Sequence, residues 1–345
     1  MSLRSLMKVL IDINEDLFNR IKEVNGGSSL SSFILIAIEN QISLEKEQHA
    51  DLLDFDKKIK KPPEPLPIIT KPQEQPMKVV DNLDFLKKPI SYENIIEVTL
   101  KTPIKDAYIW GQYNKFFALK FAVRYLAYLQ TQYNFSTVNL EEYQDKCSKA
   151  ASQMKQLLLK SDDKAGRVWG EGFSAGLPDN EEKSWSRFKH HFIGYLDSKG
   201  NSVGALSDFG FIVIQKNQVG LSSQGLAFAK CHNPILDEDP FASSLFSQEE
   251  RKFLIDHIKT YIPREWHGIQ LVLHWIDVDG VNTPDALTAK FSTLDKEWTE
   301  KMANTYRTGT LARMYDLGFI TRQKNGIKSK YLVTEDGKKV EAGQI

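Results

Sequence analysis

The sequence has few of the residues that would mark a disulfide framework or a metal-binding module. Of 345 residues only Cys147 and Cys231 are cysteine, and they stand far apart and outside any CxxC pair. They predict neither a disulfide framework nor a zinc ribbon, which fits a reducing compartment. Cys231 precedes His232, with Asp237 and Asp239 nearby, but no second ligand pair follows at metal-binding spacing. We therefore expect no metal and no cofactor.

Long apolar runs and an excess of one charge are also absent. The stretch "MSLRSLMKVLIDINEDL" is too soon interrupted by acids for a signal peptide, and no stretch reaches a membrane-spanning length. We expect a cytoplasmic protein with no membrane contact. Lys plus Arg and Asp plus Glu both total 45, so any attraction to nucleic acid must come from local patches. One such patch is residues 321–345, with six basic and three acidic residues.

Catalytic motifs are missing too. "DFG" at 208–210 lacks the glycine-rich loop and catalytic loop of a kinase, and its counterpart at 316–318 is "DLG". "GEGFSAG" at 170–176 has Ala175 where a dinucleotide fingerprint needs its third glycine, so we expect a loop. No HExxH motif, Walker loop, GxSxG nucleophile elbow or acid-acid-lysine nuclease signature can be defended in this sequence. We predict that the protein is not an enzyme; a nuclease with dispersed carboxylates is the enzymatic alternative.

Residues 8–42 predict one strand followed by two helices. "KVLIDI" at 8–13 alternates as a half-buried strand does. Asn14 can cap a first helix, and Gly27 can end it. The second helix, capped by Ser29, is apolar on almost every side through "FILIAI", so a unit this small needs a second copy to bury it.

A strand, a helix, a glycine turn and an apolar helix at these lengths resemble the ribbon-helix-helix family of dimeric DNA-binding proteins. The resemblance implies a homodimer through residues 8–42, a strand ribbon in the major groove and Ser29 at a phosphate. It also implies that the outward strand residues Lys8, Leu10 and Asp12 contact DNA. Because Leu10 is apolar and Asp12 acidic, these residues favour dimerisation over base reading.

A linker follows. "KKIKKPPEPLPIITKPQEQPMK", residues 57–78, has six prolines and predicts an extended spacer, or else a proline-rich ligand for another protein. Beyond it, helices are predicted from Pro103, over residues 139–160, over 247–262 with a serine cap, and up to Gly318.

An internal repeat is the strongest signal. "SDFGFIVIQKN" at 207–217 returns as "YDLGFITRQKN" at 315–325, with seven of eleven positions identical. "LSSQG" at 221–225 corresponds to "VTEDG" at 333–337. The second copy is therefore four residues longer between the first and the second of these matching segments. Each glycine can end a helix, the next residues can open a hairpin, and a serine or threonine can cap a final helix. "KNG" at 324–326 predicts the second hairpin turn.

Helix, "DxGFI", hairpin and "[ST]xxG" resemble the closing half of a winged-helix domain, here present twice. The resemblance implies that the helix before each hairpin lies in the DNA major groove and that the hairpin, the wing, contacts the backbone. The candidates in the first copy are Arg187, Lys189, His190, His191 and Lys216. Those in the second are Lys301, Tyr306, Arg307, Arg313, Arg322, Lys324, Lys328 and Lys330. The mostly apolar first wing indicates packing or a protein partner instead.

These observations predict a mostly α fold with small β-hairpins (α+β). They place a ribbon-helix-helix domain at 1–45, the linker at 46–78 and winged-helix domains at 79–235 and 236–345. The predicted function is a dimeric protein that binds double-stranded DNA, either a transcriptional regulator or a plasmid replication or partition factor. The alternative is a protein-interaction subunit of a larger DNA-processing or defence complex, with the partner at the first wing or the linker.

Overall fold

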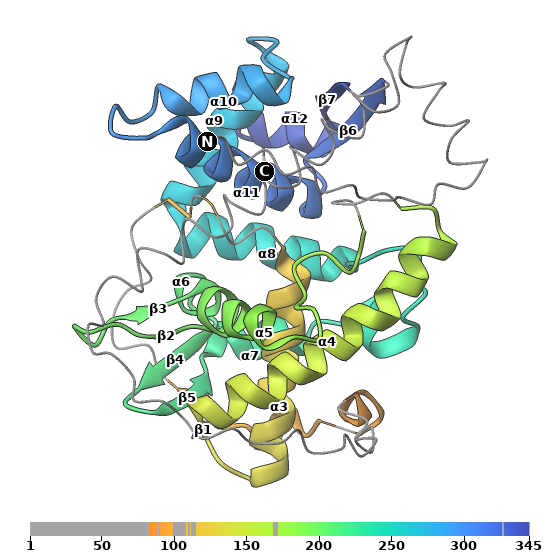
Figure 1. The fold of residues 1–345 in the computed structure, drawn as a ribbon, viewed down its shortest axis with the longest axis vertical. Helices are drawn as coiled ribbons and strands as arrows, with labels where there is room; N and C mark the ends of the chain where they lie inside the picture. The colour runs from red at the N-terminus through yellow and green to blue at the C-terminus, as the bar shows by residue number, and fades with distance from the viewer. Residues whose placement is uncertain are drawn as a thin grey trace, which may run out of the picture. The chain divides into compact units, whose positions relative to one another are not determined.

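The computed structural model describes residues 83–88, 90–98, 108–109, 111, 115–167, 172–325 and 328–344. The chain divides into two units, Met1–Met77 and Lys78–Ile345, and every described residue belongs to the second. The predicted ribbon-helix-helix segment lies outside the described residues, as does the proline-rich linker. The described part is mostly helical with three small antiparallel sheets, so the α+β class is confirmed (Figure 1). None of its helices is long and apolar enough to cross a membrane.

One group of elements surrounds the central helix α3 (Figure 1). The sheet β1-β5-β4 and the separate hairpin β2-β3 are both antiparallel. In chain order the elements are the short helices η1 (Asp84–Lys87) and η2 (Tyr92–Asn94), α3 (Phe116–Tyr133), β1 (Val138–Asn139), α4 (Leu140–Lys164), α5 (Glu182–Phe188), the π-helix η3 (Lys189–Ile193), β2 (Tyr195–Leu196), β3 (Ser202–Val203), α6 (Ala205–Asp208), β4 (Ile212–Gln215), β5 (Gln218–Leu221), α7 (Ser223–Lys230) and the π-helix η4 (Pro234–Glu238).

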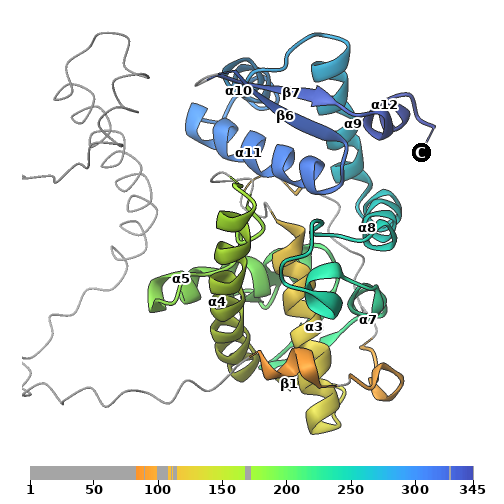
Figure 2. The same cartoon turned by 90° about the vertical axis from the view of Figure 1, so that its right-hand side faces the viewer.

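A second group begins at α8 and contains four helices, one hairpin and a final helix (Figure 2). Its elements are α8 (Gln248–Tyr261), α9 (Pro263–Asp277), α10 (Pro284–Ser292), α11 (Glu300–Asp316), β6 (Ile320–Asn325), β7 (Lys328–Val333) and α12 (Glu335–Glu341). Helix α10 packs against α11 and α9 packs against α12, and buried residues of α9, α10, α11 and α12 belong to the hydrophobic core.

Helix α3 is the centre of the first group because its sequence, "FFALKFAVRYLAYLQTQY", is apolar on nearly every side. Phe116, Phe121 and Val123 are completely buried, as expected of a helix with neighbours all round. The helix begins at Phe116, so the prediction that it starts at Pro103 was wrong. Gly111 has φ +93°, which interrupts a helix, and the amide of Ile109 donates to a carboxylate on α9 instead of to a helical carbonyl.

The first copy of the repeat forms a helix end, a hairpin and a capped helix. Gly210 has φ +68°, and its carbonyl accepts a hydrogen bond of 2.6 Å from the Ser222 hydroxyl. Ser222 also caps α7 by accepting from the amide of Gly225 at 3.0 Å. A Cβ on Gly225 would lie 1.8 Å from the carbonyl oxygen of Phe211, so the close approach requires glycine.

The second copy repeats each of these contacts. Gly318 has φ +81°, and its carbonyl accepts from the Thr334 hydroxyl at 2.7 Å. Thr334 caps α12 by accepting from the amide of Gly337 at 3.1 Å, and a Cβ on Gly337 would lie 2.2 Å from the Phe319 oxygen. The sequence repeat is therefore a structural repeat, because in both copies the two glycines and the capping hydroxyl make the same contacts between the helix end, the hairpin and the final helix.

The two hairpins differ in length. In the first, Lys216 and Asn217 form the turn, with Lys216 at φ +56°. In the second, the corresponding Lys324 and Asn325 lie within β6, which pairs with β7 through Asn325 and Lys328. The predicted "KNG" turn at 324–326 was therefore placed too early, because the four extra residues lengthen both strands rather than the loop.

Candidate nucleic-acid interface

Helix α11 has three different faces. Ala303, Thr310 and Met314 are buried in the core of the second group. A second face is covered by the segment before α3: a Cβ on Gly309 would lie 1.7 Å from the carbonyl oxygen of Gly111. That contact places the backbone of residue 111 directly on α11. Only the remaining face can approach a ligand.

The remaining face of α11 carries one stripe of exposed residues at helical spacing. Lys301, Asn304, Thr308 and Tyr315 are all exposed and lie on one side of the helix. Asn can pair with adenine in the major groove, and Lys can contact guanine or phosphate. The stripe thus offers one cation and three uncharged polar groups, of which the sequence identified only Lys301.

Arg313 does not belong to this surface, so its prediction as a DNA contact was wrong. It is 1% exposed, and its guanidinium forms an ion pair of 2.6 Å with Glu265 on α9. The same guanidinium donates to the carbonyl of Ile109, while the Ile109 amide donates to Glu265 at 2.9 Å. Arg313 therefore holds the segment before α3 against α11 instead of facing solvent.

Tyr306 is also directed away from the exposed stripe. Its ring packs against Trp298 at 4.5 Å between centroids, in a T-shaped arrangement. A Cβ on Gly111 would lie 2.9 Å from the ring, so Tyr306 lines the covered face of α11. Of the predicted residues on this helix, Lys301 is exposed and Arg307 is half-buried.

The β6–β7 hairpin presents its cations on two faces. Arg322 pairs with Tyr331 across the strands and Lys324 with Ser329, so their side chains share the face that also carries the buried Ile320. Lys330 pairs with Gln323 on the opposite, exposed face. Arg322 is half-buried, whereas Lys324 and Lys330 are exposed. The side chain of Lys328 lies outside the described part of the structure.

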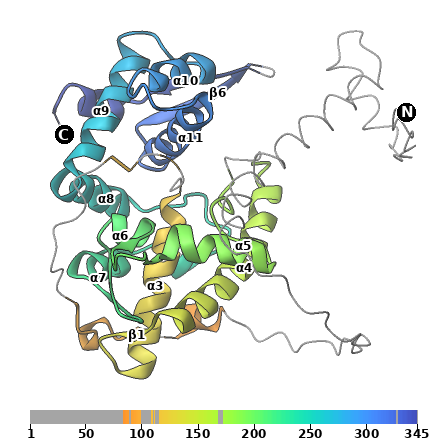
Figure 3. The ribbon, with the colours of Figure 1, turned by 60° about the vertical axis from the view of Figure 1, so that its left-hand side comes forward.

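Arg307 bonds to two neighbours on its own helix. Its Nη2 donates to Asn304 Oδ1 at 2.8 Å and to Thr308 Oγ1 at 3.1 Å. Burial lowers the pKa of Arg307, the neighbouring Tyr331 and Asp285 raise it, and the positive charge of Arg322 lowers it. Helix α11 and strand β6 lie side by side (Figure 3). Helix α11 with its exposed stripe and the hairpin that carries Arg322 and Lys324 are therefore packed elements of the same group.

The first copy is built differently where a recognition helix is predicted. Helix α5 and the π-helix η3 end at Gly194, the β2–β3 hairpin follows, and only α6, four residues long, precedes Gly210. Gly194 and Gly204 cross so closely that a Cβ on Gly204 would lie 2.4 Å from the Gly194 Cα. The first copy thus has no continuous helix corresponding to α11.

Its predicted contact residues are correspondingly scattered. Arg187 and His190 are exposed, His191 is half-buried, and Lys189 forms an ion pair with Asp145 on α4. Lys216 is exposed at the tip of β4–β5.

That tip is fixed to the body of the first group. The carbonyl of Asn217 accepts a hydrogen bond from the amide of Leu140 at 3.0 Å. The hairpin is also short, with strands of four residues, and β5 is paired on both sides. It therefore cannot extend towards a duplex as far as β6–β7, whose strands have six residues. The amino-terminal candidates Lys8, Leu10, Asp12 and Ser29 lie outside the described residues.

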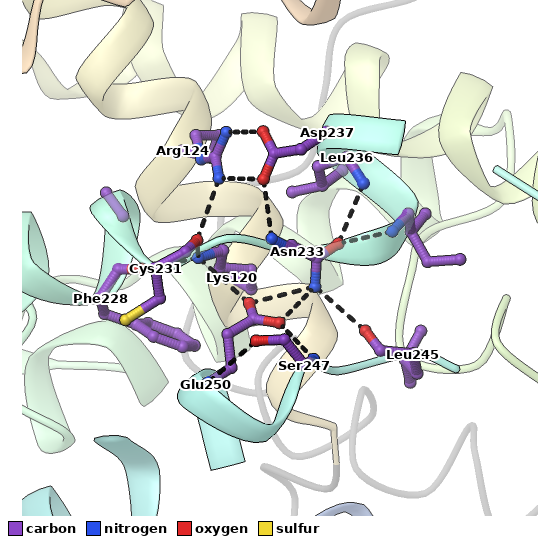
Figure 4. Close-up of polar contacts among 12 residues, drawn as sticks. Lys120, Arg124, Phe228, Cys231, Asn233, Leu236, Asp237, Leu245, Ser247 and Glu250 are labelled. Carbon is purple, nitrogen blue, oxygen red and sulfur yellow. Dashed lines mark hydrogen bonds and ion pairs between the residues drawn. The ribbon is translucent and has the colours of Figure 1, made fainter. Parts of the chain in front are cut away.

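A buried polar cluster surrounds Lys120 on α3 (Figure 4). Its Nζ donates to the carbonyls of Phe228 at 2.6 Å and Cys231 at 2.5 Å and lies 3.1 Å from Glu250 Oε1 on α8. Asn233 donates to both Glu250 oxygens and to the carbonyl of Leu245. Burial lowers the pKa of Lys120, and burial raises the pKa of Glu250.

This cluster holds elements together and leaves no reactive group accessible. Lys120, Asn233 and Glu250 have no solvent exposure, and each of them bonds to protein atoms. One helical turn later on α3, Arg124 forms a bidentate pair with Asp237 on η4 at 2.5 and 2.8 Å. No motif in the sequence marks this cluster, although two cations in so apolar a helix already imply buried partners.

The loop at "GFSAG", residues 172–176, holds the side-chain carboxylate of Asp162. Asp162 at the end of α4 accepts from the amides of Phe173 at 2.8 Å and Ser174 at 3.0 Å, and from the Ser174 hydroxyl. A Cβ on Gly172 would lie 2.5 Å from the Asp162 carboxylate, so glycine is required there. The residues therefore form the predicted loop, and the anion that fills it is a side chain.

Within the described residues, no three His, Cys, Asp or Glu side chains gather in a way that could hold a metal ion. Cys147 and Cys231 are both free and buried, and burial raises the pKa of the Cys231 thiol to about 11. A thiol with a raised pKa is a poor nucleophile, because the thiolate is the reactive form.

Comparison with known proteins returns no match: no family model, no curated protein and no solved structure resembles this chain significantly.

Proposed function

We propose that this chain binds double-stranded DNA through α11 and the β6–β7 hairpin. The carrying observation is that α11, with its exposed stripe, packs against strand β6 of the hairpin that carries Arg322, Lys324 and Lys330. A helix that fits the major groove next to a cationic hairpin that can reach the backbone supplies both base and phosphate contacts.

The order of elements supports the resemblance to a winged-helix domain. Helices α9, α10 and α11 are followed by the hairpin and by α12, and the two strands of the hairpin pair over their full length. In this proposal α11 is the recognition helix and β6–β7 is the wing. The first copy shares the junction of the repeat but has an interrupted helix, so we assign DNA contact to the second copy.

The role we propose is that of a cytoplasmic, non-enzymatic DNA-binding protein, either a transcriptional regulator or a plasmid replication or partition factor. The amino-terminal segment would pair two chains as a ribbon-helix-helix dimer. Two linked DNA-binding units raise the effective concentration of each on the duplex, so a dimer would bind more tightly than either unit alone.

A pool of random-sequence duplexes tests the proposal. Full-length protein is incubated with the pool at about 50 mM salt, where phosphate contacts are strong, and the retained DNA is sequenced. We expect duplexes to be retained and a sequence motif to be enriched. If a folded protein retains no duplex under these conditions, the proposal is wrong.

Protein contact within a larger DNA-processing or defence complex is a second candidate function, and it rests on the first copy. Its interrupted helix and its short, anchored hairpin do not suit groove binding, and Lys189 is already paired within the protein. On this view the first copy is a docking module for a protein. Changing Arg187 and Lys216 to Ala would then leave duplex affinity unchanged, whereas a loss of affinity would assign DNA contact to the first copy as well.

A further inference from the structure

Asn304, on the exposed stripe of α11, is held in one orientation by Arg307. The Nη2 of Arg307 donates to Asn304 Oδ1 at 2.8 Å. A guanidinium has donors and no acceptor, so only the oxygen of the Asn304 amide can face it. The reversed amide would place two N–H donors against each other. The hydrogen bond therefore fixes which end of this amide is turned to Arg307 and which end is left for a ligand.

The guanidinium of Arg307 is itself anchored at two points along the helix. The same Nη2 donates to Thr308 Oγ1 at 3.1 Å, and Thr308 lies about one turn after Asn304. The Thr308 hydroxyl donates to the carbonyl of Asn304 at 2.8 Å. Arg307 is half-buried, whereas Asn304 and Thr308 are exposed. Arg307 thus bridges two exposed residues, and their arrangement is formed before any ligand arrives.

The groups that Asn304 and Lys301 offer a ligand are hydrogen-bond donors. The Nδ2 of Asn304 has two hydrogens and donates no hydrogen bond within the described part of the chain. Lys301, three residues earlier on the same stripe, carries an ammonium, which has donors only. The hydrogen of the Thr308 hydroxyl is already donated to the Asn304 carbonyl. A base read by this part of α11 must therefore present acceptors.

Guanine is the base whose edge fits these donors. In the major groove guanine presents two acceptors, N7 and O6, whereas adenine presents the acceptor N7 beside the donor N6. The usual pairing of asparagine with adenine needs Oδ1 and Nδ2 together on the base edge. In this chain Oδ1 is turned to Arg307, so the N6 donor of adenine would be left without its acceptor. Thymine presents only one acceptor, and cytosine presents a donor.

We infer that Asn304 selects guanine in the major groove and that Arg307 is the positioning residue that sets this choice. The inference rests on the proposed function and adds to it the base required at one position of the bound sequence. Arg307 acts through the Asn304 amide and not by touching the base. Its role is therefore visible in the identity of the preferred base, which a role in folding alone would not change.

Sequence selection with full-length variants tests the inference. Each chain selects from the same pool of random-sequence duplexes, and its enriched motif is aligned with that of the wild type. We expect the wild-type motif to hold a guanine at one position whose preference disappears in Asn304→Ala, while the other positions keep theirs. A duplex with another base at that position should bind the wild type about tenfold more weakly.

Two variants should change the preferred base instead of removing the preference. In Arg307→Met the amide is able to turn, so Asn304 can pair with adenine and the position should change from guanine to adenine. In Asn304→Asp the side chain has acceptors only, so the position should change to cytosine, whose N4 group is a donor. A purely structural role of Arg307 would instead lower the affinity for all duplexes alike.

Asn201→Ala is the matched control. Asn201 is also an exposed asparagine, and it lies between β2 and β3 in the first group. This variant should keep the wild-type motif at every position. Circular dichroism establishes that each variant is folded.

Three results would overturn the inference alone, while the wild type still enriches a motif. They are a motif that stays complete in Asn304→Ala, an adenine at the position that Asn304→Ala loses, and a guanine that persists there in Arg307→Met. A folded wild type that retains no duplex would overturn the proposed function as well. The two failures are therefore distinguishable in one series of selections.

Discussion

The Lys115 ammonium lies 3.1 Å from the Asp316 carboxylate, and both side chains are almost fully buried. Asp316 also accepts from the amide of Phe116 at 3.1 Å, so it caps the first residue of α3. It is the aspartate of the second repeat, at the end of α11. One residue therefore ends the proposed recognition helix and anchors the start of the central helix.

Replacing Asp316 by Asn should destabilise the protein strongly, because it leaves the Lys115 charge buried without a counter-charge. We expect a loss of about 3–5 kcal/mol in the free energy of unfolding, measured by urea titration. Asp208→Asn is the matched control at the same position of the first repeat. Asp208 is half-buried, so its loss should be about 1 kcal/mol. Equal losses in both variants would contradict the importance given to the Lys115 pair.

The glycine of each repeat junction should not tolerate a methyl group. Gly337→Ala forces a Cβ against the Phe319 carbonyl, and we expect a loss of about 3 kcal/mol in the free energy of unfolding. Gly343→Ala is the control: its φ is +69° but nothing lies within 4 Å, so only about 1 kcal/mol of backbone strain should result. The prediction is wrong if Gly337→Ala is no more destabilising than Gly343→Ala.

The buried cluster on α3 should show strong coupling. Lys120→Met leaves the Glu250 carboxylate buried without its cation. We expect the free energy of unfolding to fall by about 3–5 kcal/mol. Adding Glu250→Gln removes the unpaired charge and should recover about 1–3 kcal/mol. Urea titrations of the four chains of this double-mutant cycle measure the coupling. Strictly additive losses would show that the two charges do not depend on each other.

Stability should fall in mild acid because of His257. This side chain is 2% exposed and stacks against Phe253, and burial lowers its pKa from 6.5 to about 4. As the pH falls below 6.5 the unfolded state takes up the proton first, since its pKa is the higher one. The contribution of His257 is therefore complete above pH 6.5 and is lost between pH 6.5 and about 4, by about 3 kcal/mol in total.

His257→Phe isolates this effect. The variant loses the hydrogen bond between Nε2 and the carbonyl of Phe209, about 1 kcal/mol, at every pH. Its free energy of unfolding should then fall less steeply than that of the wild type between pH 6.5 and 4. Parallel pH profiles for the two chains would show that His257 does not titrate as proposed.

Local signals in the sequence predicted local structure well. Ser247 does cap α8, with the reciprocal contact from Glu250, and Gly210 and Gly318 end their helices, because capping depends on residues a few positions apart. The partners of buried charges could not be found in this way. From the sequence alone, Arg313 is expected to be a surface cation. It is buried because Glu265, on another helix, forms an ion pair with it.

In the candidate site, too, the local features could be predicted from the sequence and the tertiary contacts could not. The hairpin and its cations followed from the repeat, but their division between two faces depends on the register of β6 and β7. Asn304 and Thr308 gave no signal in the sequence. Their exposure follows from the segment at Gly111 that covers the neighbouring face of α11, and such a contact joins residues about 200 positions apart.

The central claim is that the β6–β7 hairpin contacts the DNA backbone, and the salt dependence of duplex binding tests it most directly. The wild type is compared with the Arg322→Ala/Lys324→Ala/Lys330→Ala variant, and with Lys338→Ala/Lys339→Ala on α12, whose lysines are paired with Glu335 and Asp336. The account predicts that the hairpin variant loses about 2–3 from the slope of log K against log salt, while the α12 variant keeps the slope of the wild type. An unchanged slope in a folded hairpin variant would contradict it.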